Sequence, residues 1–236
     1  MPGVPKWAMD TPGTLALVGG NEWTDGCTFD ERLLADSGGK DVVVLPTAAA
    51  YQHPERVVLR AAEWFEGLGA RVEGLMVVDR PSAEDPGMAA TVAKARFIYL
   101  AGGSPLHLRA ALKKSAVFEG IRSAYAAGAV IAGAGAGAMV LTDPMVDPRG
   151  GALTLGLGLV DKLTVVPHFG DEHDDAHGQK LERTVAMAPA RLPVVALPAR
   201  TALIKEGSGA WRSEGAGTPV VFVGGSQTEG LDALKG

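Results

Sequence analysis

Short β-branched segments alternate with amphipathic segments along most of the chain. Asp41–Pro46 (DVVVLP) is a continuous β-branched run, which is typical of a strand covered on both faces. Pro54–Leu68 follows it, with apolar residues at the spacing of a helix. Repeated strand–helix alternation predicts a mostly parallel central sheet with helices on both faces, which is a three-layer α/β sandwich.

The same patterns give the expected position of the other elements. Strands are expected at Thr14–Val18, Arg71–Val78, Arg96–Ala101, Ala129–Ala132 and Leu163–Val166. Helices are expected at Pro86–Lys94, Ser104–Leu112, Val117–Ala127 and Leu181–Ala188. Three more short strands, expected to be antiparallel at the edge of the sheet, are Val194–Leu197, Ala202–Ile204 and Val220–Val223. No linker or repeat interrupts the pattern, so residues 1–236 are expected to form a single domain.

Net charge and cysteine content indicate which partners and which cellular compartment to expect. The formal net charge is -5 and the longest basic run is Lys113-Lys114, which argues against nucleic acid or anionic membrane as a partner. Cys27 is the single cysteine, so we expect no intrachain disulfide and a cytoplasmic location. Residues 1–6 lack the apolar core of a signal peptide, and the uncharged stretch Ala124–Thr142 is too short and too rich in Gly and Ala for a membrane span.

Three expected strands end in residues that are unusual for simple connections. These ends are Gly102-Gly103-Ser104-Pro105, Gly133-Ala134-Gly135-Ala136-Gly137-Ala138 and Pro167-His168-Phe169. In open α/β sheets, ligands bind at the carboxyl ends of the strands. The three ends are therefore the expected place for chemistry.

The middle segment has the build of a nucleophile elbow, in which a strand turns sharply into a helix. The usual pattern is Gly-x-Ser-x-Gly, and this chain has glycine at the central position, Gly135. Glycine adopts a strained bend readily but has no side chain to attack a carbonyl. The spacing alone is also compatible with simple strand–helix packing or with a phosphate-binding turn.

The order of these motifs resembles peptidase family S51, the family of aspartyl dipeptidases and cyanophycinases, within the class I glutamine amidotransferase-like superfold. The resemblance covers nearly the whole chain. The segments that carry it are Leu17-Val18-Gly19-Gly20, Tyr99-Leu100-Ala101-Gly102-Gly103, Ala132–Met139, Gly156-Leu157-Gly158-Leu159, Pro167-His168-Phe169 and Thr201-Ala202-Leu203.

The resemblance implies roles for individual residues. It places the family nucleophile at Gly135, the family histidine at His168 and the third, acidic member at Asp147, with Asp143 as the alternative. It implies backbone oxyanion donors at Gly103 and Ala136, and substrate contacts at Gly102 and Ser104. One family branch instead has an acid before Thr-Ala-Leu, where this chain has Leu197-Pro198-Ala199-Arg200.

The resemblance also implies the ligand class. It implies a small peptide or amide, peptide bonds next to acidic residues, no cofactor, no metal and a possible homodimer. The family segment after the histidine carries arginines that meet acidic substrates, whereas residues 171–175 of this chain are mostly acidic.

Alternatives stay open at several positions. Gly135 is either natural or a replaced serine, which the codon in the source gene would distinguish. If it is natural, the cleft could bind a small ligand or a partner without catalysis. His168, His173 and His177 could hold a metal for assisted hydrolysis, against the alternative of a solvated acidic loop. Ser104 before Pro105 also fits a helix N-cap, and Asp147-Pro148 also fits a turn.

Overall fold

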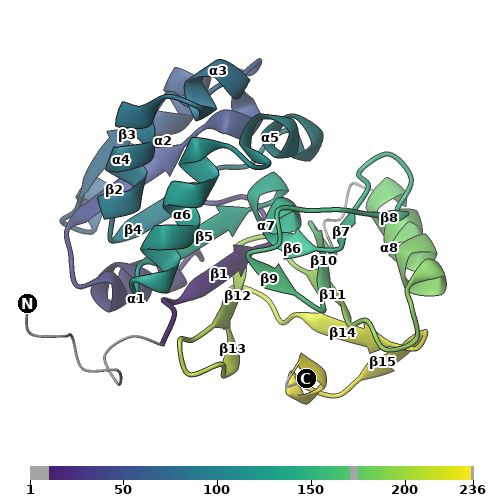
Figure 1. The fold of residues 1–236 in the computed structure, drawn as a ribbon. Coiled ribbons are helices and arrows are strands. Elements are labelled where there is room, and N and C mark those ends of the chain that lie inside the picture. Colours follow the sequence, from purple (N-terminus) through teal and green to yellow (C-terminus); the bar gives the residue numbers. More distant parts are fainter. Residues whose placement is uncertain (1–10, 171–174, 235–236) are drawn as a thin grey trace, which may run out of the picture.

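A computed structural model describes residues 11–170 and 175–234. Within these residues, seven strands form the main sheet (Figure 1). From one edge to the other they are β13 (Trp211–Gly215), β12 (Thr201–Lys205), β1 (Leu15–Val18), β5 (Val130–Ala134), β4 (Phe97–Leu100), β2 (Asp41–Leu45) and β3 (Arg71–Gly74). The five strands from β1 to β3 are parallel, and β12 and β13 are antiparallel additions. The expected mostly parallel α/β sheet is confirmed.

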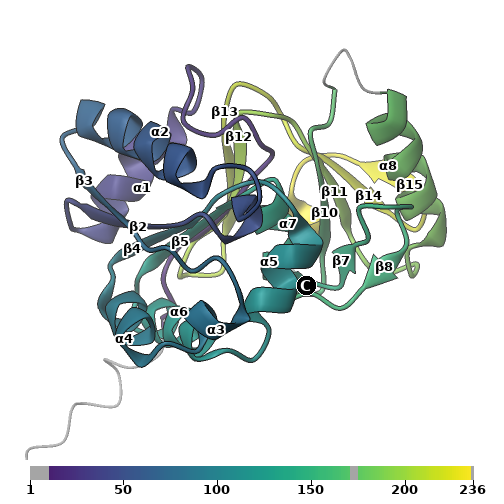
Figure 2. The same ribbon diagram turned by 90° about the horizontal axis from the view of Figure 1, so that it is seen from above.

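Both faces of the main sheet are buried under helices, which makes the three layers. In β1, Leu15 and Leu17 face one apolar core while Ala16 and Val18 face the other, because successive side chains of a strand point to opposite faces. Figure 2 shows the two helical layers. One layer holds α1 (Phe29–Ser37) and α2 (Pro54–Gly67); the other holds α3 (Arg80–Ala83), α4 (Pro86–Lys94), α5 (Pro105–Leu112), α6 (Ala116–Ala126) and α7 (Ala136–Leu141).

A second sheet lies beside the main one and corrects one expectation. Its strands, in order, are β10 (Thr164–Pro167), β11 (Val194–Leu197), β14 (Val220–Val223) and β15 (Ser226–Thr228). Of the three C-terminal strands expected at the edge of the main sheet, only the one now in β12 lies there. The other two, β11 and β14, belong to the second sheet, and β11 is parallel to β10. The chain changes sheet in the short turn from Pro198 to Arg200.

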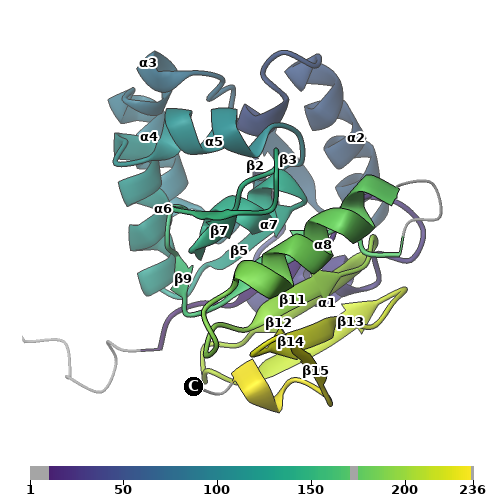
Figure 3. The same cartoon turned by 90° about the vertical axis from the view of Figure 1, so that its right-hand side faces the viewer.

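Helix α8 (Asp175–Met187) covers the second sheet (Figure 3). Its Leu181 is buried with Val166 of β10 and Val194 of β11. The opposite side of the sheet contributes Val165, Val195 and Val221 to the same apolar core as α4–α7. The two sheets therefore share one continuous core, and the end of β10 is brought close to the end of β5.

Several boundaries differ from the sequence patterns. The strand expected at Arg71–Val78 ends at Gly74, where the side chain of Val58 occupies the space that a Cβ would need. Helix α1 was not assigned from the sequence, because most of its residues are polar. Short elements complete the described chain: β6 (Thr142–Asp143) pairs with β9 (Val160–Asp161), β7 (Met145–Val146) pairs with β8 (Leu153–Thr154), and short 3-10 turns occur at Thr47–Ala49 and Asp232–Leu234.

None of the helices in residues 11–170 and 175–234 is long and apolar enough to cross a bilayer.

Candidate active site

The bend between β5 and α7 is made entirely of small residues. Gly135 lies at its apex with φ 49° and ψ -104°, a backbone conformation in which L side chains are strained. A Cβ on Gly133 would lie 2.6 Å from the carbonyl carbon of Gly137, and one on Gly137 would lie 2.4 Å from the Leu100 carbonyl oxygen. The close approach of helix to strand therefore requires glycine on both sides of the bend.

His168 reaches the bend from the end of β10. Its own backbone has φ 61°, which is uncommon outside glycine, and its N–H donates to the Gly19 carbonyl at 2.9 Å. The imidazole packs directly on Gly20, where a Cβ would lie only 2.2 Å from Cε1 of the ring. The Gly19-Gly20 pair at the end of β1 therefore makes the room that the histidine occupies.

The distance from Gly135 to the His168 ring leaves room for a side chain that would hydrogen-bond to the imidazole. A Cβ placed on Gly135 would lie 3.5 Å from Nε2 of His168. An oxygen on such a Cβ would fall within hydrogen-bond reach of that nitrogen. The main chain thus retains the geometry for a side chain that glycine does not supply.

The loop after β4 lies beside this pair. Gly103 has φ 140°, and a Cβ there would lie 2.4 Å from the Ala48 carbonyl oxygen, which also accepts the Ser104 N–H at 2.8 Å. Ser104 is the N-cap of α5: its Oγ accepts the His107 N–H at 3.3 Å, and Pro105 follows at the first helical position. The N-cap expectation for Ser104 is confirmed.

A recess of about 320 Å³ opens where these three strand ends meet, and we call it the site recess. Its lining includes five of the residues expected at the site: Gly102, Gly103, Gly135, Ala136 and His168. Ser104 is not among the lining residues, although its neighbour Pro105 is. Segments far apart in the sequence therefore meet here as expected, with the Ser104 hydroxyl turned to its capping role.

Glu22 also lines this recess, although no motif in the sequence indicated a role for it. It follows Gly19-Gly20 at the end of β1 and is 8% exposed. Its Oε1 accepts the Gly102 N–H at 2.9 Å, which ties the end of β1 to the glycine loop after β4. Its place four residues after the end of β1, just past Gly19-Gly20 and Asn21, is the sequence feature that could have indicated it.

Asp147 occupies the turn between β7 and β8. Arg149 binds its carboxylate three times: the backbone N–H and Nε donate to Oδ1 at 2.9 Å each, and Nη2 donates to Oδ2 at 2.6 Å. These hydrogen bonds from Arg149 lower the pKa of Asp147 to about 2. Val146 and Pro148 line the site recess on either side of it. The alternative acid, Asp143, accepts the Gly156 N–H at 3.3 Å.

The metal alternative falls partly outside the described residues. His173 lies in the segment 171–174, and the side chain of His177, in α8, is likewise outside the description. Of the three histidines, the structure places only His168. In the part of the chain that is described, no group of three His, Cys, Asp or Glu side chains could hold a metal ion.

Comparison with known proteins gives one family. The model of peptidase family S51 matches residues 15–212. The chain is similar to a cyanophycinase of Synechococcus elongatus (27% identical over 205 residues, 82% of this chain and 61% of the relative). It is also similar to a cyanophycinase of Trichormus variabilis (28% over 191 residues, 76% of this chain and 63% of the relative). The chain thus spans less than two thirds of the length of these relatives.

The fold agrees with a solved structure from another source. The crystal structure of a peptidase from an acI-B1 Actinobacterium superposes with a TM-score of 0.80 at 26% identity, covering 92% of this chain and 93% of that one. The family model covers most of the chain, and the strand ends that it includes are those that line the site recess. The chain therefore belongs to peptidase family S51.

Proposed function

We propose that the site recess binds a small peptide or amide in the manner of an S51 peptidase, and that this chain forms no acyl-enzyme because residue 135 is glycine. The observation that carries the proposal is the 3.5 Å separation between a Cβ at Gly135 and Nε2 of His168, in a bend already held in the strained conformation. The similarity to cyanophycinases and to a solved peptidase supports an amide or peptide as the ligand class.

In this proposal each part of the recess has a defined task. The backbone N–H groups of Gly103 and Ala136 would polarise the carbonyl of the bound amide, as oxyanion donors do. His168 would face the carbonyl from the side of residue 135, where the family takes a proton from serine. Glycine offers no oxygen for the covalent step, and removal of a serine nucleophile typically costs roughly 10⁶ in kcat.

Gly135→Ser tests the proposal directly. We expect this variant to react with a fluorophosphonate probe at residue 135 and to hydrolyse small peptides, because the new hydroxyl falls within reach of His168. Gly135→Ala is the matched control: it has the same backbone strain, costing about 1–3 kcal/mol of stability, without a hydroxyl. A folded Gly135→Ser protein that is labelled no faster than Gly135→Ala would refute the proposal.

Whether Asp147 orients His168 can be tested separately in the Gly135→Ser background. The family resemblance gives this acid the task of orienting His168, whereas its contacts with Arg149 are those of a turn residue. Asp147→Asn should slow labelling by at least about a hundredfold if it orients the histidine. A loss of stability with unchanged labelling would assign it to the turn alone.

A further inference from the structure

A second recess lies away from the glycine bend, and we call it the basic recess. Its volume is about 480 Å³, which is within the range of pockets that bind small molecules. Its lining comes from β9 and the turn after it, the segment before β11, the hairpin of β12 and β13, and the C-terminal 3-10 turn. In Figure 1, β9, β12 and β13 lie along the lower side of the molecule. The basic recess shares no lining residue with the site recess.

The two recesses lie at opposite ends of β1 and β12. Lys205, which lines the basic recess, ends β12 and pairs in register with Leu15 at the start of β1. At the other end of these strands the Thr201 carbonyl accepts the Gly19 N–H at 2.9 Å, beside the glycines that carry His168. Four residues of strand separate Lys205 from Thr201, a span of roughly 13 Å. A molecule in the basic recess is therefore a separate ligand and not an extension of an amide bound at Gly135.

Three basic side chains from separate elements converge on the basic recess. Lys162 lies in the turn between β9 and β10, Arg191 precedes β11, and Lys205 ends β12. None of the three makes an ion pair with an acid within residues 11–170 and 175–234. Asp161, the one acidic residue of the described lining, makes no ion pair within these ranges either. The recess therefore presents three cations against one carboxylate, in a chain whose formal net charge is -5.

Lys162 occupies a backbone position that favours other residue types. Its φ is 62°, in the left-handed region where glycine and asparagine are preferred. Val160 and Leu163 on either side of it are buried in the main core. The lysine is therefore presented by a turn that is anchored at both ends rather than by a free loop.

Trp211 gives the recess an aromatic wall. It pairs with Lys205 across β12 and β13, and the Lys205 ammonium lies 5.8 Å from the centre of the indole ring. The Trp211 side chain is half-buried and packs against the main core. Leu163, Pro193 and Leu234 add apolar surface to the lining. The recess thus combines a surface for a planar ring with cations for an anion.

We propose that the basic recess binds a small organic phosphate that carries a planar ring, the chemistry shared by nucleoside monophosphates and aryl phosphates. A phosphate monoester has a charge of about −1.5 to −2 at neutral pH and three acceptor oxygens, so it can meet cations from three elements. A carboxylate has two oxygens and a single charge, which suits this arrangement less well. The phosphate binds between Lys162, Arg191 and Lys205, and the ring lies against Trp211.

The test measures binding of matched ligands to the whole protein by calorimetry. The probes are AMP and phenyl phosphate, their neutral counterparts adenosine and phenol, and inorganic phosphate. We expect AMP, phenyl phosphate or both to bind with a Kd below about 1 mM, at least about tenfold more tightly than the neutral counterpart and than inorganic phosphate. This binding should weaken as salt is added. Binding of AMP alone would assign the site to nucleoside phosphates, and binding of phenyl phosphate alone would assign it to aryl phosphates.

A double variant, Lys162→Asn with Arg191→Gln, tests whether the ligand occupies the basic recess. The matched control is Lys114→Asn with Arg122→Gln, because Lys114 also has a positive φ (58°) and neither control residue lines the recess. Both variants lose one lysine and one arginine, and asparagine tolerates the backbone at both lysine positions. We expect the recess variant to bind the ring-bearing phosphate about tenfold or more weakly, and the control to bind it as wild type does.

A further variant, Trp211→Leu, tests the position of the ring. It should remove most of the preference for the ring-bearing phosphate over inorganic phosphate, because the aromatic wall is lost. An unchanged preference in this variant would refute the position of the ring.

Three other results would overturn the inference. Inorganic phosphate that binds as tightly as the ring-bearing phosphates would make the recess a site for an adventitious ion only. Equal affinities in the recess variant and its control would show that the ligand does not occupy the basic recess. Absence of saturable binding by every probe would show that the recess holds no ligand of this class. None of these results bears on the reactivity of Gly135→Ser, so this inference and the proposed function fail separately.

Discussion

Asp30, in the first turn of α1, has a carboxyl group enclosed in the core. Its side chain is fully buried, and Oδ2 accepts the Trp64 Nε1–H at 3.0 Å. Burial is the main cause that raises the pKa of Asp30, to about 8; the negative charge of the nearby Glu22 acts in the same direction, and the hydrogen bond from Trp64 acts against both. The carboxyl group is therefore protonated in the folded protein at neutral pH.

Stability should depend on pH through this residue. An unfolded Asp ionises near pH 4, whereas the folded one holds its proton to about pH 8. The contribution of Asp30 to folding is thus complete below about pH 4 and is lost as pH rises toward 8, by at most about 1.4 kcal/mol per pH unit. Asp30→Asn keeps an oxygen for Trp64 and removes the ionisation.

The measurement is urea unfolding of wild type and Asp30→Asn at pH 5 and pH 8. We expect the variant to gain stability relative to wild type by more than about 1 kcal/mol between the two pH values. Parallel pH profiles for the two proteins would show that Asp30 ionises normally in the folded state.

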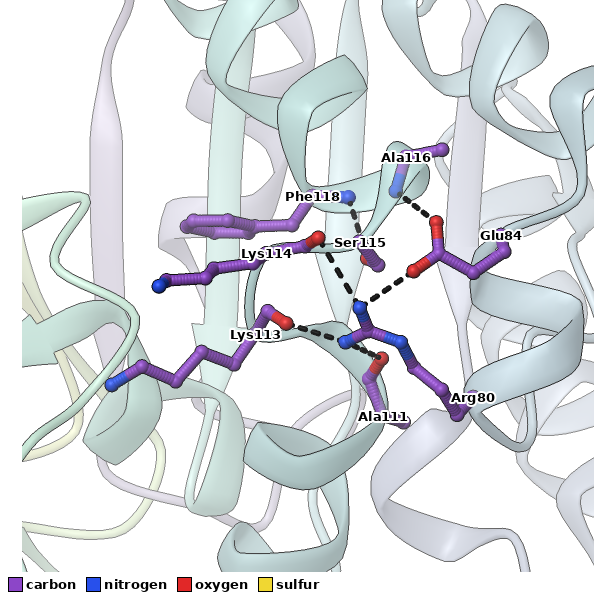
Figure 4. Close-up of polar contacts among 8 residues, drawn as sticks. All are labelled: Arg80, Glu84, Ala111, Lys113, Lys114, Ser115, Ala116 and Phe118. Atoms are coloured by element: carbon purple, nitrogen blue, oxygen red, sulfur yellow. Dashed lines mark hydrogen bonds and ion pairs between the residues drawn. The ribbon is translucent and has the colours of Figure 1, made fainter.

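Helix α3 is tied to the junction between α5 and α6 by one arginine (Figure 4). The Arg80 guanidinium donates to the carbonyls of Ala111 (3.4 Å) and Lys114 (3.2 Å), and also to that of Lys113. These carbonyls lie at the end of α5 and just after it, where the next turn leaves backbone oxygens without helical partners. The Arg80 guanidinium therefore supplies the hydrogen-bond donors that these carbonyls lack at the helix end.

The pairing partner of Arg80 extends the same connection to α6. Glu84 Oε1 lies 2.6 Å from Arg80 Nη2, while its Oε2 accepts the Ala116 N–H at 3.0 Å at the start of that helix. One ion pair thus joins the end of one helix to the beginning of the next.

Substitution of Arg80 should cost more than the removal of an ordinary surface charge. We expect Arg80→Met to lower the free energy of unfolding by about 1–3 kcal/mol, because carbonyls at the helix end lose their donors. Arg80→Lys should restore little of this, since a single ammonium does not span the separate carbonyls. Chemical denaturation of each variant provides the measurement.

Arg122→Met is the matched control for this element. Its 3.7 Å contact with Glu119 is an exposed pair within one helix, which contributes roughly 0.3–0.5 kcal/mol. Equal losses in the Arg80 and Arg122 variants would mean that the connection between helices does not contribute to stability.

The candidate site exists only because two sheets are held together. Gly135 belongs to the main sheet and His168 to the second sheet, and the shared core beneath them includes Val195 of β11. Val195 pairs in register with Val165 of β10, the strand that carries the histidine. Packing of the second sheet should therefore control the reactivity of residue 135.

Two core truncations in the Gly135→Ser background test this dependence. Val195→Ala and Val42→Ala each remove two methyl groups from a fully buried valine, so each should cost on the order of 2 kcal/mol. Val42 lies in β2 and faces the core that contains α1 and α2. We expect only Val195→Ala to slow fluorophosphonate labelling, by about tenfold or more, because the histidine moves with its strand. Equal rates in the two variants would contradict the dependence on the second sheet.

Local pattern was enough to predict the α/β class and most element positions. The run Asp41–Leu45 and the helix Pro54–Gly67 lie where their periodicity places them, because alternation and helical spacing record which faces are buried. The meeting of Gly102 and Gly135 was also predictable, since the parallel strands β4 and β5 end at the same edge of the main sheet. His168 joins them from β10 of the second sheet, and that placement depends on packing between the two sheets. Helix α1 was not predicted, because most of its residues are polar.

Only the tertiary structure showed which strands pair and which side chains meet when the residues involved are distant in sequence. The turn from Pro198 to Arg200 sends β12 into the main sheet and leaves β11 in the second, and no local pattern states which strands pair. Arg149 beside Asp147, Glu22 beneath Gly102 and the three basic side chains around the basic recess are likewise products of folding. By itself the sequence determined the elements and the glycine at position 135; the tertiary structure decided what faces that glycine, because side-chain neighbours are set by packing between elements rather than within them.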